Sequence, residues 1–223
     1  MKHKISYLAI AIVVVGGLLL PATASAANDP QLTSGGTLVS AGSGWWLTIF
    51  VFSFGDTSGN ELVKCSSGQL GGKVLKNSGS TLEGEVSSAA ISGTGALSAH
   101  NNLNECTGSF GNSYVTFSQP MCVRSTPTMA EDEFQITGGN CTSGGNVKFT
   151  VGSTTAGACE YESTSSVKGD YTTGGTEASL TVRKTTAGSG SKLIKGGFLC
   201  PSSEIIILVL ILETNNGTKL TIS

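Results

Sequence analysis

The chain has 223 residues, of which only 13% are charged, with thirteen lysines and arginines against fifteen acidic residues. This slightly acidic balance argues against nucleic-acid binding, because phosphates are bound by clusters of Lys and Arg. The 39% of hydrophobic residues can form a core, so the composition is not that of a disordered protein. The 31 glycines, with abundant Ser and Thr, are typical of extracellular β-proteins with many turns.

Residues 1–26 have the order of a secretory signal peptide. Lys2 and Lys4 give a basic start, an apolar segment follows, and Ala-Ser-Ala at 24–26 supplies a small-residue cleavage site. We therefore expect a single secreted β domain over 27–223, located outside the cell or in the cell envelope, with no membrane span after cleavage. A retained N-terminal anchor and a division into two small domains are the alternatives.

From Asn28 onward, short apolar or alternating runs are separated by Gly, Ser and Asn. This spacing predicts an all-β fold, an antiparallel β-sandwich or flattened barrel stapled by disulfides, with at most one short helix. The helix is expected over Thr126–Glu133, because Thr126 can cap it and Pro127 suits the first helical position. The polar segment His100–Cys106 is interpreted as a loop. The predicted strands are 45–54, 62–65, 70–75, 84–91, 114–117, 134–137, 147–151, 159–162, 167–172, 178–182, 193–199, 205–212 and 219–222.

Two predicted strands, 45–54 and 205–212, are apolar on both faces. The second holds eight consecutive aliphatic residues, far fewer than the roughly 20 that span a bilayer. A strand with one face in water alternates, so both strands need a cover on the second face. We expect them to be neighbours in a buried central pair beneath a loop or the short helix. Burial against another copy of the protein, hence self-association, is the alternative.

All six cysteines lie after the leader, and an even number in an exported protein is typical of three disulfides. Six cysteines allow fifteen connectivities, of which we expect the sequential one. A zinc site is the alternative, but the sequence has no Cys-x-x-Cys pair and a single histidine after the leader, so we expect no metal and no cofactor. The expected pairs are Cys65 with Cys106, Cys122 with Cys141, and Cys159 with Cys200.

Three segments in the second half place a cysteine among hydroxyl-bearing residues: Cys122–Thr126, Cys159–Thr164 with Gly169–Thr173 behind it, and Gly197–Ser203. These segments resemble a group of uncharacterised exported proteins of soil actinobacteria. The first half, which contains Cys65-Ser-Ser-Gly, is similar to the same group only loosely. The resemblance implies export, β-structure and disulfides, and it carries over no catalytic residue.

Few residues are candidates for catalysis. The sequence has no Gly-x-Ser-x-Gly motif whose serine His100 could activate as a base, so we expect His100 to be non-catalytic. Glu160 and Glu162 are candidates for the carboxylate pair of a glycosidase, which must face each other about 5 to 10 Å apart across a cleft. The period of two places both on the solvent face of a strand, with Cys159 and Tyr161 on the core face. We therefore expect no catalytic pair there.

Other patterns that suggest binding also have ordinary structural explanations. The acidic run Glu131–Glu133 lacks the alternating ligands and turn glycine of a calcium loop, so we expect a solvated turn. Gly138-Gly139 and Gly174-Gly175 are expected to be hairpin turns rather than phosphate-binding loops, since neither leads into a helix.

Aromatic residues can form a platform for sugar rings, yet Trp45 and Trp46 are adjacent and point to opposite sides of a strand. Tyr114, Tyr161 and Tyr171 are expected to be half-buried with their hydroxyls in water. We therefore expect a non-enzymatic binding or structural protein, with cell-wall or extracellular polysaccharide as the candidate partner. A secreted carbohydrate-active enzyme with paired carboxylates is the alternative.

Overall fold

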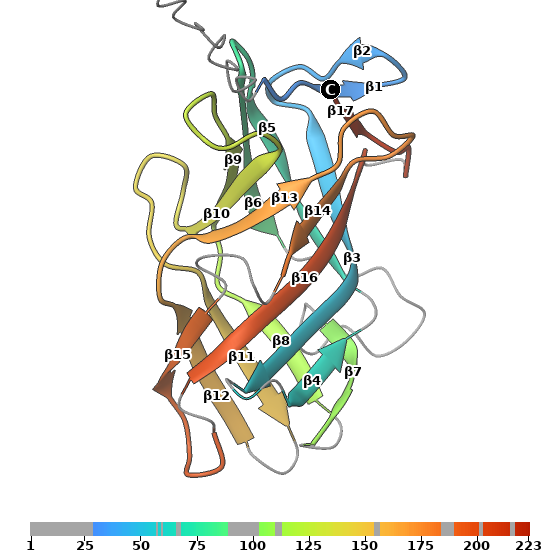
Figure 1. Cartoon of the computed structure of the whole chain (residues 1–223). Helices are drawn as coiled ribbons and strands as arrows, with labels where there is room; N and C mark the ends of the chain where they lie inside the picture. The colour runs from blue at the N-terminus through green and yellow to red at the C-terminus, as the bar shows by residue number, and fades with distance from the viewer. Residues whose placement is uncertain are drawn as a thin grey trace, which may run out of the picture.

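The computed structural model describes residues 29–223 with the exception of 57, 59, 66–67, 89–102, 110–112, 154–156, 184–189, 201–202 and 215–216. The described residues form an all-β, antiparallel fold without a helix (Figure 1). Within the same ranges, no helix is long and apolar enough to cross a membrane.

The strands, in chain order, are β1 (Leu32–Ser34), β2 (Thr37–Leu38), β3 (Gly44–Asp56), β4 (Glu61–Cys65), β5 (Gln69–Ser78), β6 (Thr81–Ser88), β7 (Leu103–Gly108), β8 (Ser113–Phe117), β9 (Met121–Ser125), β10 (Glu133–Gly138), β11 (Lys148–Ser153), β12 (Gly157–Ser163), β13 (Val167–Tyr171), β14 (Ser179–Val182), β15 (Gly190–Lys195), β16 (Ser203–Thr214) and β17 (Thr221–Ile222). Most predicted strands are confirmed, including the alternation of buried and partly exposed residues along β10 and β12.

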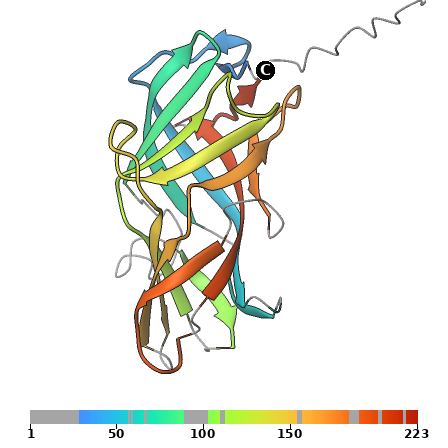
Figure 2. The same ribbon diagram turned by 60° about the vertical axis from the view of Figure 1, so that its left-hand side comes forward.

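Fourteen of the described strands follow one another in a closed ring, and two of them, β3 and β16, also pair with each other across it. This cross-pairing divides the ring into two smaller rings of eight strands that share β3 and β16 (Figures 1 and 2). The upper ring adds β5, β6, β9, β10, β13 and β14. The lower ring adds β4, β7, β8, β11, β12 and β15.

The expected pairing is confirmed, because β3 and β16 are hydrogen-bonded along most of their length. The short helix that was expected as one possible cover of the pair does not occur among the described residues. The inward residues of β3 belong to the core, whereas Thr48 and Ile211 lie opposite each other on the outer face. On that face, Ser53 and Ile211 are buried and Val51 is partly buried. The outer face of the pair is therefore shielded from solvent at Ser53 and Ile211. The structure does not describe the other aliphatic side chains of β16 on this face, except Val209.

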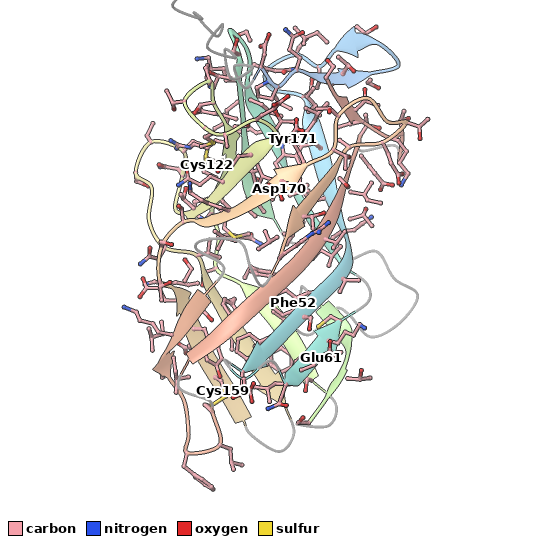
Figure 3. The ribbon with its side chains drawn as sticks, in the orientation of Figure 1. Phe52, Glu61, Cys122, Cys159, Asp170 and Tyr171 are labelled. Atoms are coloured by element: carbon pink, nitrogen blue, oxygen red, sulfur yellow. A yellow bond between two sulfur atoms is a disulfide. The ribbon has the colours of Figure 1, made fainter. Side chains whose placement is uncertain are left out.

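The lower ring is filled by a cluster of aromatic side chains. Phe52 and Phe54 from β3 meet Phe149 of β11 edge to face, and Phe149 stacks on Tyr161 of β12 with ring centroids 5.4 Å apart. Phe117 of β8 completes the cluster. Such offset and edge-to-face pairs add stabilisation beyond their buried area. Figure 3 shows Phe52 and Cys159 within this lower half.

The upper ring is filled by aliphatic and aromatic side chains, and two of the aromatic rings lie over glycines. A Cβ at Gly84 of β6 would lie 2.8 Å from the Trp45 ring, and a Cβ at Gly169 of β13 would lie 2.6 Å from the Phe134 ring. The missing side chains therefore make room for the two rings inside the ring of strands. A three-stranded sheet, β17-β1-β2, covers this end and contributes the buried residues Leu32 and Ile222 to the core.

Three disulfides join Cys65 to Cys106, Cys122 to Cys141, and Cys159 to Cys200. The predicted sequential pairing is therefore confirmed, and among the described cysteines none is free. Three disulfides indicate that the protein matures in an oxidising compartment.

The expected helix over Thr126–Glu133 is wrong. This segment links the paired strands β9 and β10 by two successive turns, closed by bonds from Met129 N to Thr126 O and from Glu133 N to Ala130 O. Asp132 has a left-handed φ of 59°, which a continuing helix does not accommodate. Two separate turns therefore take the place of a helix in this seven-residue link.

Two further predictions need correction. The segment before Cys106, which was expected to be a loop, contains part of β7. This strand pairs with β4, and the register places Cys106 directly opposite its disulfide partner Cys65. The strand expected over 193–199 runs instead over Gly190–Lys195. After Lys195 the chain turns back towards β16, with Cys200 N bonded to Gly197 O.

Candidate functional site

A polar cleft lies where loops leading to the upper ring approach strands β11 and β12 of the lower ring. It has a volume of about 310 Å³, at the lower end of the range typical of ligand pockets, which begins near 300 Å³. Its lining residues are Ser118, Gln119, Pro120, Gly138, Gly139, Gly144, Gly145, Asn146, Lys148 and Glu162.

One wall of the cleft is the loop between β10 and β11, and several bonds fix its shape. The Asn140 side-chain oxygen accepts hydrogen bonds from the Thr142 backbone and hydroxyl and from the Ser143 backbone. Cys141 is joined to Cys122 of β9, and Arg124 Nη2 donates to the Cys141 carbonyl at 2.5 Å. The wall is therefore organised in advance of any ligand.

The floor of the cleft carries one positive and one negative side chain. Lys148 of β11 and Glu162 of β12 are directly opposite each other in the strand register. Glu162 lies 3.7 Å from Lys192, which is on the next strand, β15. Within the described part of the chain, Lys148 forms no salt bridge. The cleft therefore has an available cationic donor beside a carboxylate acceptor.

Glycines leave the backbone of the wall accessible. Gly144 has a left-handed φ of 63°, and a Cβ placed there would meet nothing within 4 Å. Gly138 donates its N–H to the Gly145 carbonyl, which holds the two sides of the loop together. The wall therefore offers a ligand close approach to backbone groups, a common use of glycine at binding sites.

The second wall is the short link between β8 and β9. It contains Ser118, Gln119 and Pro120, and the Gln119–Pro120 peptide bond is cis. Ser118 N donates to the Lys148 carbonyl at 2.8 Å, which joins this link to the strand that forms the floor. Both walls of the cleft are therefore tied to ordered strands.

The structure confirms the prediction for Glu160 and Glu162. Both lie on the outer face of β12, while Cys159 and Tyr161 are buried on its inner face. Glu160 is bound to Lys195 at 3.0 Å. Only Glu162 of the two lines the cleft. These carboxylates stand side by side on one surface and do not face each other across a substrate site.

Among the described side chains, Trp45, Tyr114, Tyr161 and Tyr171 do not form a sugar platform. Trp45 is buried inside the upper ring. Tyr161 and Tyr171 occupy inward positions and are buried, so the expectation that they are half-buried with hydroxyls in water is wrong for both. Burial raises the pKa of Tyr171, which keeps its hydroxyl neutral at physiological pH. Tyr114 is half-buried, with its ring against Gly152 of the neighbouring strand.

Other candidates from the sequence have ordinary places or lie outside the described residues. Glu133 is bound to Lys168 at 2.9 Å, so this end of the acidic run forms an ion pair between neighbouring strands. His100 and the side chain of Trp46 lie outside what the structure describes. No group of three or more potential metal ligands occurs among the described residues.

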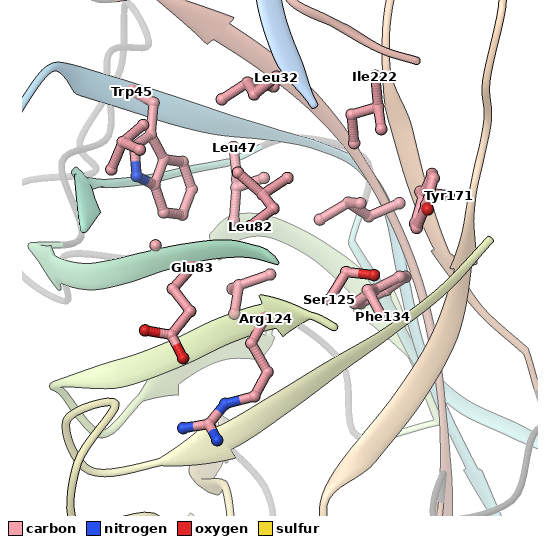
Figure 4. Close-up of a pocket in the computed structure, with 14 residues that line it drawn as sticks. Leu32, Trp45, Leu47, Leu82, Glu83, Arg124, Ser125, Phe134, Tyr171 and Ile222 are labelled. Atoms are coloured by element: carbon pink, nitrogen blue, oxygen red, sulfur yellow. The ribbon is translucent and has the colours of Figure 1, made fainter. Parts of the chain in front are cut away.

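An apolar cavity inside the upper ring is too small to be a ligand site. Its volume is about 30 Å³, room for little more than a water molecule. Figure 4 shows Leu47, Leu82 and Trp45 around it, with the charged ends of Glu83 and Arg124 directed away. We interpret it as a packing void next to the Trp45 ring.

No family model, curated protein or solved structure matches the chain. The candidate site therefore depends on the geometry alone. The sequence analysis singled out Glu162, Gly138 and Gly139 but missed the cleft, since Ser118, Asn146 and Lys148 are ordinary surface residues until the fold brings them together. The only available signal was the unusually glycine-rich link before β11.

Proposed function

We propose that this chain is an exported, non-enzymatic protein that binds an extracellular or cell-wall polysaccharide in the polar cleft. The signal-peptide pattern and three disulfides support secretion or residence in the cell envelope. Membership of the exported actinobacterial group, suggested by the cysteine-containing segments, is part of the same proposal.

The observation that carries the proposal is the balanced lining of the cleft. Lys148 donates, Glu162 accepts, and the amide side chains of Gln119 and Asn146 can do both. Lys148 and Glu162 give the lining one charge of each sign, so the lining has no net charge to favour a strongly charged ligand. Hydroxyl groups both donate and accept hydrogen bonds, so a neutral ligand rich in hydroxyls fits this lining best.

Binding is favoured over glycoside hydrolysis because of the carboxylates. Hydrolysis needs two carboxyl groups on either side of the scissile bond. Among the described residues that line the cleft, Glu162 is the single carboxylate. The neighbouring Glu160 is held by Lys195 outside the cleft.

The test is to incubate the purified protein with a panel of polysaccharides and wall fractions, scoring retention and released sugars separately. We expect retention without release. Glu162→Gln or Lys148→Ala should weaken retention by about tenfold, the effect of losing one hydrogen bond to a charged group.

Glu160→Gln is the matched control, because Glu160 lies on the same strand face and has a similar ion pair but does not line the cleft. Equal loss of retention for Glu160→Gln and Glu162→Gln would place the binding elsewhere. Release of sugar that disappears in Glu162→Gln would establish the enzyme alternative.

A further inference from the structure

The turn between β15 and β16 presents apolar side chains to solvent at the end of the molecule. Phe198 is 97% exposed, and Ile194 and Leu199 are 43% and 42% exposed. The bond from Cys200 N to Gly197 O, 3.0 Å long, closes a turn with Phe198 and Leu199 at its two central positions. Figures 1 and 2 show this loop at the lower end, opposite the sheet formed by β1, β2 and β17.

This apolar turn is held in place by covalent and hydrogen bonds. Cys200 is joined to the buried Cys159 of β12, and β15 pairs with both β12 and β16. The turn therefore presents Phe198 from a fixed base. A preorganised apolar group loses little conformational entropy when it binds, which favours its use as an anchor.

The exposed apolar area of the turn comes from three side chains on a projecting tip. A Phe side chain has on the order of 200 Å², and less than half of Ile194 and of Leu199 is exposed. The three together offer on the order of 400 Å² of apolar surface. Because Phe198 is almost fully exposed, a protein partner would need a pocket shaped to receive it. A lipid surface needs no matching shape, because each apolar side chain partitions into it separately.

Charged groups surround the base of the turn as they do in proteins that lie on lipid surfaces. Lys192 and Lys195 are exposed. Their apolar stems can lie against the lipid when the tip inserts, while their ammonium groups stay among the lipid headgroups. Their partners Glu162 and Glu160 balance the charge. The apolar tip, and not headgroup charge, should therefore dominate binding.

We propose that this turn inserts Phe198 and Leu199 into the interfacial layer of a lipid bilayer. The proposed lipid contact is independent of polysaccharide binding, because it depends on none of the cleft residues except the outward ion pair of Glu162.

The test is sedimentation of the purified protein with vesicles of phosphatidylcholine, and with vesicles that contain equal parts of phosphatidylcholine and phosphatidylglycerol. We expect binding to both compositions, with little change in salt. Phe198→Ser should lower the partition coefficient at least about tenfold, the effect of losing the burial of one large apolar side chain. Leu38→Ser is the matched control, because Leu38 is 47% exposed but lies on β2 at the opposite end.

A second variant, Phe198→Trp, reports insertion directly. Its emission should shift to shorter wavelength when vesicles are added, relative to the wild-type protein. Absence of sedimentation, or equal sedimentation of wild type and Phe198→Ser, would overturn the proposal. A shift that follows protein concentration without vesicles would also overturn it, because the tip would then insert into a second copy.

Discussion

The side chain of Asn77 is hydrogen-bonded to both the backbone N–H and the backbone carbonyl of Leu32. The Asn77 side-chain oxygen accepts from Leu32 N at 2.9 Å, and its nitrogen donates to Leu32 O at 2.7 Å and to Val39 O at 2.8 Å. Asn77 is buried on β5, so these bonds join the upper ring to the sheet that covers it. A buried amide with three partners of this kind is well satisfied.

We expect Asn77→Ala to lower the free energy of unfolding by about 2 to 4 kcal/mol. The substitution leaves the buried Leu32 N and the partly buried Val39 O without these partners, and a buried group left unpaired costs about 1 to 3 kcal/mol. Urea denaturation measures the change. Ser78→Ala, at the exposed neighbouring position, should change the free energy of unfolding by less than about 0.5 kcal/mol. A similar loss in both variants would mean that the side-chain bonds of Asn77 contribute little.

Low pH should weaken the interaction of Glu213 on β16 with Lys219 of the C-terminal segment. Burial alone would raise the pKa of Glu213, but hydrogen bonds from Lys219 and Thr48, with the charge of Lys219, lower it below its ordinary value of 4.5. A lowered pKa in the folded state gives stability that is present above 4.5 and is lost as pH falls through the folded value. We therefore expect Glu213→Gln to be less stable than wild type at pH 7.

The stability difference between Glu213→Gln and wild type should shrink as the pH falls below 4.5. It should vanish once Glu213 of the folded wild-type protein is protonated, because the side chain at 213 is then neutral in both proteins. Denaturant titrations at several pH values measure it. Glu160→Gln is a suitable comparison, because its ion pair with Lys195 is more exposed and such pairs contribute about 0 to 1 kcal/mol. A pH-independent difference for Glu213→Gln would contradict the linkage.

Gly84→Ala should destabilise the upper ring. The added methyl group would lie 2.8 Å from the buried Trp45 ring, which must move or distort the strand. Overpacking of this kind typically costs about 1 to 3 kcal/mol. Gly197→Ala is the control, because a Cβ there meets nothing within 4 Å. Thermal unfolding of the two variants measures the difference, and equal midpoints would show that the Trp45 ring moves into the adjacent cavity at no cost.

The disulfides should differ in their contributions. The Cys159–Cys200 disulfide closes a loop with a sequence separation of 41 residues, whereas Cys122–Cys141 closes one of 19 residues. Paired serine substitutions open each loop in turn. In the chain-entropy model the losses are about 4 and about 3 kcal/mol respectively. Denaturation of the two double variants under oxidising conditions tests this order. A larger loss for the shorter separation would mean that local packing, not chain entropy, dominates.

The local pattern of the sequence was sufficient to predict individual strands. The alternation around Cys159 and Tyr161 correctly assigned the two faces of β12 because it depends only on neighbouring residues. The helix predicted from Thr126 and Pro127 was wrong because the pairing of β9 with β10 leaves only a short link between them. The strand before Cys106 was missed because its register with β4, and not its own apolar content, holds it in place.

The two-ring architecture and the cleft could not be read from local patterns. Both depend on which distant strands become neighbours, and Glu204 lies opposite Asp56 although they are far apart in the chain. In the cleft, Ser118 and Lys148 meet because β8 pairs with β11. Hydrophobic periodicity specifies the face of a strand but not its partner.

The sharing of β3 and β16 has a consequence for the order of folding. Each ring closes only when β16 is in place, and β16 is the last long strand of the chain. A nascent chain that ends before residue 203 therefore leaves the edges of β3 open in both halves. Pairing across so long a sequence separation is slow, and open strand edges recruit other chains. We expect the protein to reach its native state only after release of nearly the whole chain, in one cooperative step for both halves.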